Sequence, residues 1–286
     1  MDISKYRVSN GSDFVLADYA TRDRGPYKKK THALKDQKAN TAIIASEQDK
    51  MYAQDHWGVI ILTQAMDAAG KDGLIKHVLT GVNPLGTQVF SFKQPSAEEL
   101  DHDYLWRINQ RLPERGRIGI FNRSYYEDVL VVKVHNLIAS SKLPDQLITD
   151  DIWDQRYRQI RDYERYLAEN GFIIIKFFLN VSKEEQKERF LSRIDNQSKN
   201  WKFSTADVRE RGHWDEYMDA YEKAIQNTAT EDNPWYILPA DRKWYARTLA
   251  SEIIAKRISA LGNKYPDVGE EKLAELEIAR QQLEDE

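Results

Sequence analysis

A short stretch of small residues carries a lysine at a position suited to phosphate chemistry. Residues 64–73 read Gln-Ala-Met-Asp-Ala-Ala-Gly-Lys-Asp-Gly and lie between an apolar run at 57–63 and a segment with helical spacing. Where side chains are small, backbone N–H groups can converge on phosphate oxygens, and the following helix N-terminus adds its dipole. Lys71 would then reach the transferring phosphates. The residues expected around the phosphates are Ala68, Ala69, Gly70, Asp72 and Gly73.

This segment departs at two positions from the common phosphate-loop pattern G-x-x-x-x-G-K-[ST]. Ala65 stands in place of the first glycine, and Asp72 in place of the hydroxyl residue that binds Mg²⁺. An alternative is a tight strand-to-helix turn in which Gly70 and Gly73 only relieve steric strain. The order of strand, small residues, Gly-Lys and helix favours a phosphate site whose metal ligand has been displaced.

A second polar segment follows a short apolar run at 117–121 and begins Asn122-Arg123-Ser124. In P-loop enzymes an acidic residue at the end of such a strand usually organises Mg²⁺. Asn122 carries no charge, so the missing carboxylate is assigned to Asp67 or Glu127. Ser124 and Glu127 also form a capping-box pattern, but capping leaves Arg123 unexplained. We therefore expect a guanidinium beside the phosphate site.

A third segment, at about 189–211, is rich in cations. Arg189 and Arg193 are spaced i,i+4 on one helix face, and Lys199 and Lys202 follow. Nucleotide kinases need a mobile basic lid, because closure excludes water and brings positive charge to the moving phosphoryl group. The alternative is a solvated helix face. Trp201 is expected to pack rather than to stack on a base.

The elements that must position these residues alternate along the chain. Near-continuous apolar runs alternating with helical segments predict a parallel sheet covered by helices on both faces, a three-layer α/β/α fold. We expect one domain at 51–264, a basic lead-in at 1–50 and an acidic tail at 265–286. The predicted strands are 57–63, 87–92, 117–121, 172–179 and 235–238, and the main predicted helices after the loop are 97–111, one from Ser124, 151–169, one from Ser182, 207–226 and 243–261.

Composition narrows the class of protein. The 286 residues are 41% hydrophobic and 31% charged, as in soluble globular proteins. The absence of cysteine excludes disulfides and thiolate metal sites and favours the cytoplasm. No run approaches the ~20 apolar residues of a membrane span, so no membrane partner is expected. The net charge of −4 with local basic clusters suits a small polyanion better than a nucleic acid.

Three motifs, together with the basic segment at 18–30, resemble those of the family-2 polyphosphate kinases, over roughly residues 10–260. They are Asp-Ala-Ala-Gly-Lys-x-Gly at 67–73, Phe-Asn-Arg-Ser-Tyr-Tyr-Glu at 121–127, and Arg-Ile-Asp followed by Lys-Asn-Trp-Lys-Phe-Ser at 193–204. The resemblance implies a P-loop kinase-like fold with a helical lid, Mg²⁺ or Mn²⁺ as cofactor, and a homodimer or homotetramer. It also implies that Arg193 and Lys202 reach phosphates, with Lys199 and Arg189 as further lid contacts.

The resulting hypothesis is direct, in-line transfer of the terminal phosphoryl group of polyphosphate to AMP and ADP, giving ADP and ATP. Guanine nucleotides are further candidate ligands. Asp67, Lys71, Arg123 and Arg193 are the expected catalytic residues, with Asp67 and Glu127 as metal ligands. The Asn122 form of the second motif resembles the subgroup that accepts both mono- and diphosphates. Two alternatives stay open: an ATP-dependent nucleoside monophosphate kinase of the thymidylate kinase type, and a non-enzymatic polyanion-binding protein.

Overall fold

The computed structural model describes all residues, 1–286, and is built on one six-stranded sheet. The strand order is β1-β6-β5-β2-β4-β3, with β1 antiparallel to β6 and the other neighbours parallel. The five predicted strands are confirmed to within a residue at each end. The strands are β1 (Arg7–Val8), β2 (Gly58–Gln64), β3 (Thr87–Ser91), β4 (Ile118–Asn122), β5 (Phe172–Asn180) and β6 (Trp235–Pro239).

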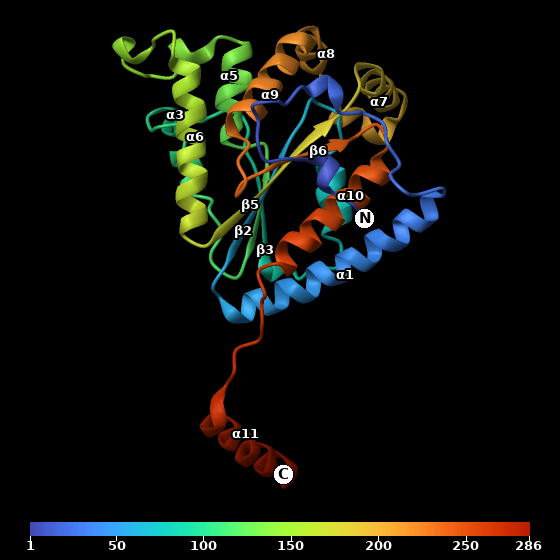
Figure 1. Cartoon of the computed structure of the whole chain (residues 1–286), viewed down its shortest axis with the longest axis vertical. Helices are drawn as coiled ribbons and strands as arrows, with labels where there is room; N and C mark the ends of the chain where they lie inside the picture. Colours follow the sequence, from blue (N-terminus) through green and yellow to red (C-terminus); the bar gives the residue numbers. More distant parts are fainter.

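Helices cover both faces of the sheet, as the apolar strands predict. Every residue of β2 is buried, which requires cover above and below because side chains alternate between faces. Figure 1 shows α1 and α10 on one side, and α6 and α9 on the other. The helices are α1 (Lys30–Gln54), α2 (Lys71–Val78), α3 (Ala97–Leu100), α4 (Trp106–Asn109), α5 (Val131–Val134), α6 (Ile152–Glu169), α7 (Lys183–Asp195), α8 (Thr205–Gly212), α9 (Trp214–Thr228), α10 (Lys243–Ser259) and α11 (Gly269–Glu284).

Three predicted helices are interrupted. The segment 97–111 forms α3 and α4 with a turn between them, where the Asp103 carboxylate accepts a hydrogen bond from Leu105 N (2.9 Å). The segment after Ser124 begins as a 3-10 turn at Tyr125–Val129, and the predicted helix 207–226 divides at His213 into α8 and α9. The first break has a local cause, the Asp103 hydrogen bond, which helical spacing alone does not reveal.

The N-terminal segment belongs to the same folded body as the sheet. β1 pairs with β6, and α1 packs along α10 (Figure 1). The terminal amine donates to Glu252 on α10 at 3.0 Å. The acidic tail instead forms α11, an exposed helix that projects away from the body in Figure 1. None of the helices combines the length and the apolar character that a membrane crossing requires.

A buried ion pair fixes two tyrosines of the second motif. Lys176 on β5 donates to the Glu164 carboxylate on α6 at 2.6 Å, and both side chains are fully buried. Glu164 also accepts from the hydroxyls of Tyr125 and Tyr126, each at 2.8 Å. Since buried charges must be paired and hydrogen-bonded to be tolerated, this network holds the Tyr125–Tyr126 segment, and hence the preceding Arg123, in one place.

Candidate active site

The predicted phosphate loop connects β2 to α2 with a strained backbone. Ala68 has φ 62° and Gly70 has φ 113°, and the left-handed conformation costs a non-glycine residue about 1–2 kcal/mol. Lys71 is the first residue of α2, and its ammonium folds back to donate to Ala65 O at 2.8 Å. Burial lowers the pKa of Lys71, against the opposing effect of the Asp67 carboxylate. The loop therefore holds a desolvated cation at a helix N-terminus, as phosphate binding requires.

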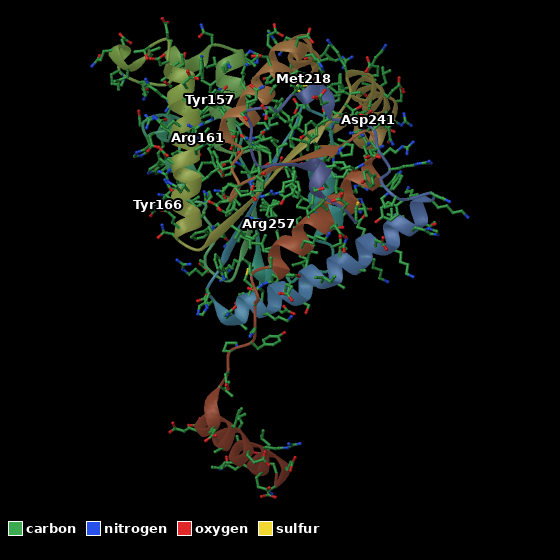
Figure 2. The ribbon with its side chains drawn as sticks, viewed as in Figure 1. Tyr157, Arg161, Tyr166, Met218, Asp241 and Arg257 are labelled. Atoms are coloured by element: carbon green, nitrogen blue, oxygen red, sulfur yellow. The ribbon has the colours of Figure 1, made fainter.

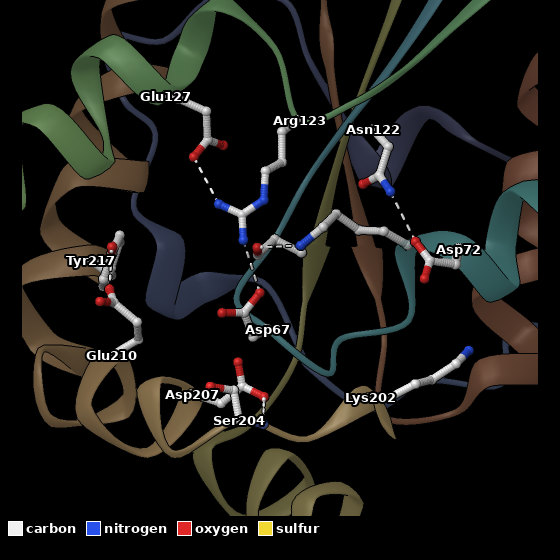
Figure 3. Close-up of polar contacts among 12 residues, drawn as sticks. Asp67, Asp72, Asn122, Arg123, Glu127, Lys202, Ser204, Asp207, Glu210 and Tyr217 are labelled. Carbon is white, nitrogen blue, oxygen red and sulfur yellow. Dashed lines mark hydrogen bonds and ion pairs between the residues drawn. The ribbon is translucent and has the colours of Figure 1, made fainter. Parts of the chain in front are cut away.

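The second motif meets this loop at the carboxyl edge of the sheet, as the sequence predicts. Thr63 on β2 and Asn122 on β4 are register partners, and Arg123 N donates to Thr63 O at 3.2 Å. The Arg123 guanidinium bridges two carboxylates, with Nη1 to Glu127 Oε2 at 3.0 Å and Nη2 to Asp67 Oδ1 at 3.1 Å (Figure 3). The Glu127 carboxylate, and then that of Asp67, raises the pKa of Arg123 against the opposing effect of burial. Arg123 is therefore a permanent cation beside the loop.

The capping box predicted for Ser124 and Glu127 is wrong. The Ser124 hydroxyl accepts from Tyr126 N at 3.2 Å, but the Glu127 carboxylate turns away to Arg123. Arg123 has φ 64°, so the backbone reverses ahead of the cap and aims the guanidinium toward Glu127. Ser124 therefore caps the turn as expected, and only the Glu127 half of the box is replaced by an ion pair.

The polar groups here fit Mg²⁺ that is also bound by substrate phosphates. There is no cluster of three or more His, Asp or Glu that could hold a metal alone, and Mg²⁺ usually takes one or two carboxylates plus phosphates and water. Asp67 keeps Oδ2 free of hydrogen bonds. At Glu127, Oε2 accepts from Arg123, and Oε1 accepts from Gln64 at 3.0 Å when the Gln64 amide takes the orientation that satisfies both its oxygen and its nitrogen. The Asn122 Oδ1 atom is buried without a partner, while Nδ2 donates to Asp72 Oδ1 at 2.8 Å. Asp67 is thus the better-placed metal ligand, with the Asn122 carbonyl available.

Arg189 on α7 binds the backbone of the phosphate loop. Its buried guanidinium donates to the loop carbonyls of Ala68 and Ala69, at 3.1 Å and 2.5 Å, and to Ala240 O at 2.6 Å. Its Nε bonds Glu185 at 2.9 Å. A phosphate contact by Arg189 stays a prediction, and these bonds show that its guanidinium also fixes the positions of two loop carbonyls.

We expect Arg189→Lys to lower kcat by about tenfold to 100-fold, since small displacements of catalytic groups have effects of that size. A lysine keeps the charge but cannot reproduce the planar fork that reaches several carbonyls at once. The Michaelis constant for the nucleotide should change far less. Initial rates over a range of nucleotide concentration measure both quantities, and Arg158→Lys on the exposed face of α6 is the matched control. A loss confined to the Michaelis constant would show direct substrate binding instead.

The lid cations lie near the loop without contacting it. Arg193 Nη1 donates to Lys202 O at 3.2 Å, and its guanidinium lies 3.7 Å from the Asp207 carboxylate. The ammonium groups of Lys199 and Lys202 make no hydrogen bond or ion pair, and that of Lys202 lies 4.9 Å from the centre of the Trp201 ring. Trp201 is 78% exposed, so its expected packing role is wrong. Phosphate contact by these cations remains a prediction that requires the lid to close.

Sequence reasoning missed several groups at this edge. The Gln186 amide donates to Asp67 O at 2.9 Å. Asp207 and Glu210 on α8 lie on the same side of the site as Asp67 (Figure 3). Burial and the Asp67 carboxylate raise the pKa of Asp207. Burial would raise the pKa of Glu210, but its hydrogen bonds with Tyr217 (2.6 Å) and His135 (2.9 Å) outweigh it and lower that pKa. The i,i+3 spacing of Asp207 and Glu210 is the sequence signal that places both carboxylates on one face of the lid helix.

Known proteins match the chain over almost its whole length. A sequence model described as polyphosphate kinase 2 matches residues 27–265. The chain belongs to the polyphosphate kinase 2 family. Two relatives have nearly the same length. An ADP-polyphosphate phosphotransferase of Rhodopseudomonas palustris is 48% identical over 281 residues, covering 98% of this chain and 97% of the relative. An AMP/ADP-polyphosphate phosphotransferase of Meiothermus ruber is 43% identical over 265 residues, covering 92% and 96%.

A solved member of the family has the same architecture. The crystal structure of polyphosphate kinase 2 from Arthrobacter aurescens TC1 superposes with a TM-score of 0.88 at 36% identity, covering 97% of this chain and 96% of that one. The predicted three-layer P-loop kinase-like fold is confirmed. Family membership also disfavours the thymidylate kinase alternative, whose fold is similar but whose donor is ATP.

Proposed function

We propose that the protein transfers the terminal phosphoryl group of inorganic polyphosphate to AMP and ADP, giving ADP and ATP. One observation carries the proposal: Asp67, Lys71 and Arg123 converge at the carboxyl edge of a parallel sheet in a polyphosphate kinase 2 protein. Open α/β sheets bind ligands at this edge. A single cationic centre can therefore align a phosphate chain with a nucleotide.

The chain supplies positioning and charge rather than a covalent intermediate. Lys71 and the loop N–H groups would hold the phosphates of the donor, and Arg123 would face the phosphates of the nucleotide acceptor. Both substrates are anions, so preorganised cations reduce their repulsion and stabilise the charge that develops on the transferring group. Arg123 is held by its two carboxylates before any substrate arrives, which keeps the reorganisation during transfer small.

Mg²⁺, or Mn²⁺ with the same oxygen ligands, would supply positive charge that offsets the charge of the phosphates when bound. Asp67 is the residue that would hold it, through the carboxylate oxygen that Arg123 leaves free. The lid helix α8, with Asp207 and Glu210, packs close by and would exclude water on closing. Arg193 and Lys202 would approach the phosphates in that movement.

The range of nucleotides proposed as phosphoryl acceptors is argued from Asn122. An amide at the end of β4 repels an incoming phosphate less than a carboxylate would, so we propose that AMP and ADP are both accepted. The name of the Meiothermus ruber relative includes both nucleotides, and that of the Rhodopseudomonas palustris relative only ADP. A GDP-polyphosphate phosphotransferase of Pseudomonas aeruginosa, 34% identical over 189 residues, supports testing guanine nucleotides as well.

The acceptor range is tested by product analysis. The protein is incubated with Mg²⁺, polyphosphate and either AMP or ADP, and the nucleotides are separated by anion exchange. We expect ADP and then ATP from AMP, and ATP directly from ADP. The Lys71→Ala protein, purified in the same way, controls for contaminating kinases. Formation of ATP from ADP without any ADP from AMP would refute the proposed range.

A further inference from the structure

The side chain of Gln186 on α7 connects the phosphate loop to the lid helix α8. Its amide nitrogen donates to Asp67 O at 2.9 Å, and its amide oxygen accepts from Arg211 Nη1 at 2.9 Å. Arg211 lies in the last turn of α8. The Gln186 side chain is only 1% exposed, so bulk water does not compete for either bond. One buried amide therefore contacts both the loop and the lid.

The two bonds of Gln186 need a group that donates at one end and accepts at the other. The carbonyl of Asp67 can only accept and the guanidinium of Arg211 can only donate, which also fixes the orientation of the amide between them. An ionised glutamate at position 186 would accept from Arg211 but could not donate to Asp67 O. A methionine, which is similar in size, would make neither bond.

Helix α7 binds three consecutive carbonyls of the phosphate loop. Gln186 binds the carbonyl of Asp67. Arg189, three residues further on the same face of α7, binds those of Ala68 and Ala69. The peptide between Asp67 and Ala68 leads into the left-handed conformation of Ala68 (φ 62°). The Gln186 bond therefore holds the strained part of the loop and, with it, the backbone from which the Asp67 carboxylate projects.

The first turn of α7 is itself fixed to the end of the sheet. Ser182 N, at the N-cap of α7, donates at 2.8 Å to the carboxylate of Asp241, which follows β6 and is labelled in Figure 2. The Ser182 hydroxyl accepts from Glu185 N at 3.1 Å. Arg211 also donates to Lys183 O in this turn, at 2.6 Å. The lid helix thus rests on the same anchored segment that reaches the loop.

We propose that Gln186 is a positioning residue that couples the position of the lid helix α8 to the geometry of the phosphate loop. The inference deepens the proposed function and rests on it. While Arg211 holds the amide oxygen, the amide nitrogen stays directed at Asp67 O. If α8 moves away, the amide can rotate and the loop loses this bond. Because coupling between two sites is reciprocal, release of the loop by loss of the whole amide should loosen the lid as well.

Hydrogen–deuterium exchange of the protein without substrates tests this coupling. Arg211→Met removes no group that contacts the loop, yet we expect the loop amides at 65–70 to exchange at least about twofold faster, as for partial loss of one hydrogen bond. Gln186→Glu keeps the acceptor for Arg211 and loses the donor to Asp67 O. In that protein the loop should exchange faster while α8 stays close to wild type. Arg209→Met, which removes an exposed cation from the same helix, is the control.

Initial rates with polyphosphate and ADP measure the effect on the reaction. Gln186→Met should lower kcat by about tenfold, since small displacements of catalytic groups have effects of that size or larger. The Michaelis constant for ADP should change less than about threefold. If Gln186 and Arg211 act as one unit, the Gln186→Met/Arg211→Met protein should be within about twofold of Gln186→Met alone. Independent roles would instead make the two losses multiply.

Unchanged loop exchange in the Arg211→Met protein, or multiplied losses of kcat in the double variant, would overturn the coupling. Thermal unfolding verifies the fold of each variant, and the exchange test on Arg211→Met needs no substitution at the buried position 186. Exchange is measured without a donor, so its result does not depend on the substrate. If the wild-type protein forms no product from polyphosphate with any acceptor, the proposed function fails instead, and the two failures are distinguishable.

Discussion

Replacing Lys71 with alanine should lower the rate of phosphoryl transfer by at least about 100-fold, because loss of one preorganised electrostatic contact to a transition state costs about 10²–10³ in kcat. Lys71 is suited to such a contact. Its ammonium is desolvated at the N-terminus of α2, and its hydrogen bond within the protein is to the carbonyl of Ala65. In a site of low dielectric constant its charge acts strongly on phosphates.

The same change should not destabilise the protein. Burial lowers the pKa of Lys71 in the folded state, so its protonation favours the unfolded chain. This unfavourable contribution is complete below the folded pKa and disappears as the pH rises through the unfolded value. At neutral pH the alanine variant should therefore unfold at the same temperature or higher. Initial rates and thermal unfolding followed by circular dichroism measure the two effects, with Lys76→Ala on the exposed face of α2 as control. Near-wild-type turnover would remove the phosphate loop from the mechanism.

The second large effect is expected for Asp67→Asn. This change keeps the shape of the side chain but removes the charge that would bind Mg²⁺ and that pairs with Arg123 at 3.1 Å. We expect activity at ordinary Mg²⁺ concentration to fall by at least about 100-fold, as for other losses of transition-state charge stabilisation. The Mg²⁺ concentration that gives half-maximal activity should rise as well.

A comparison with Glu127→Gln separates the two candidate metal ligands. Both Glu127 oxygens are used by Arg123 and Gln64, so this variant should shift the Mg²⁺ requirement much less than Asp67→Asn does. Asp49→Asn, an exposed carboxylate on α1, controls for the change of net charge. Full activity of the Asp67→Asn protein would transfer the metal role to Glu127.

The sheet and the phosphate loop were predictable because their signals are local. β2 and β5 are buried on both faces, which leaves continuous apolar runs in the sequence. The loop needs small residues, a Gly-Lys pair and a following helix, and all lie within ten residues. Parallel pairing of β2 with β4 then brings Arg123 to the loop, because neighbouring parallel strands end at the same edge of the sheet.

The parts that could not be predicted depend on contacts between distant residues. β1 has only two residues, and pairs with β6 at the other end of the chain. The spacing of Arg189 and Arg193 places both on one helix face but does not say that Arg189 points at backbone carbonyls. Ser124 and Glu127 have the pattern of a capping box. The Glu127 carboxylate instead pairs with Arg123, because the left-handed backbone of Arg123 directs its guanidinium toward that carboxylate.

The most direct test of the account is whether polyphosphate, rather than ATP, is the phosphoryl donor. Phosphorus NMR can follow a mixture of protein, Mg²⁺, polyphosphate and ADP that contains no ATP at the start. We expect the β-phosphate resonance of ATP to appear while the polyphosphate signal declines, and the Lys71→Ala protein to give neither change. Absence of ATP in that mixture, together with rapid conversion of AMP and ATP to ADP by the same protein, would contradict it.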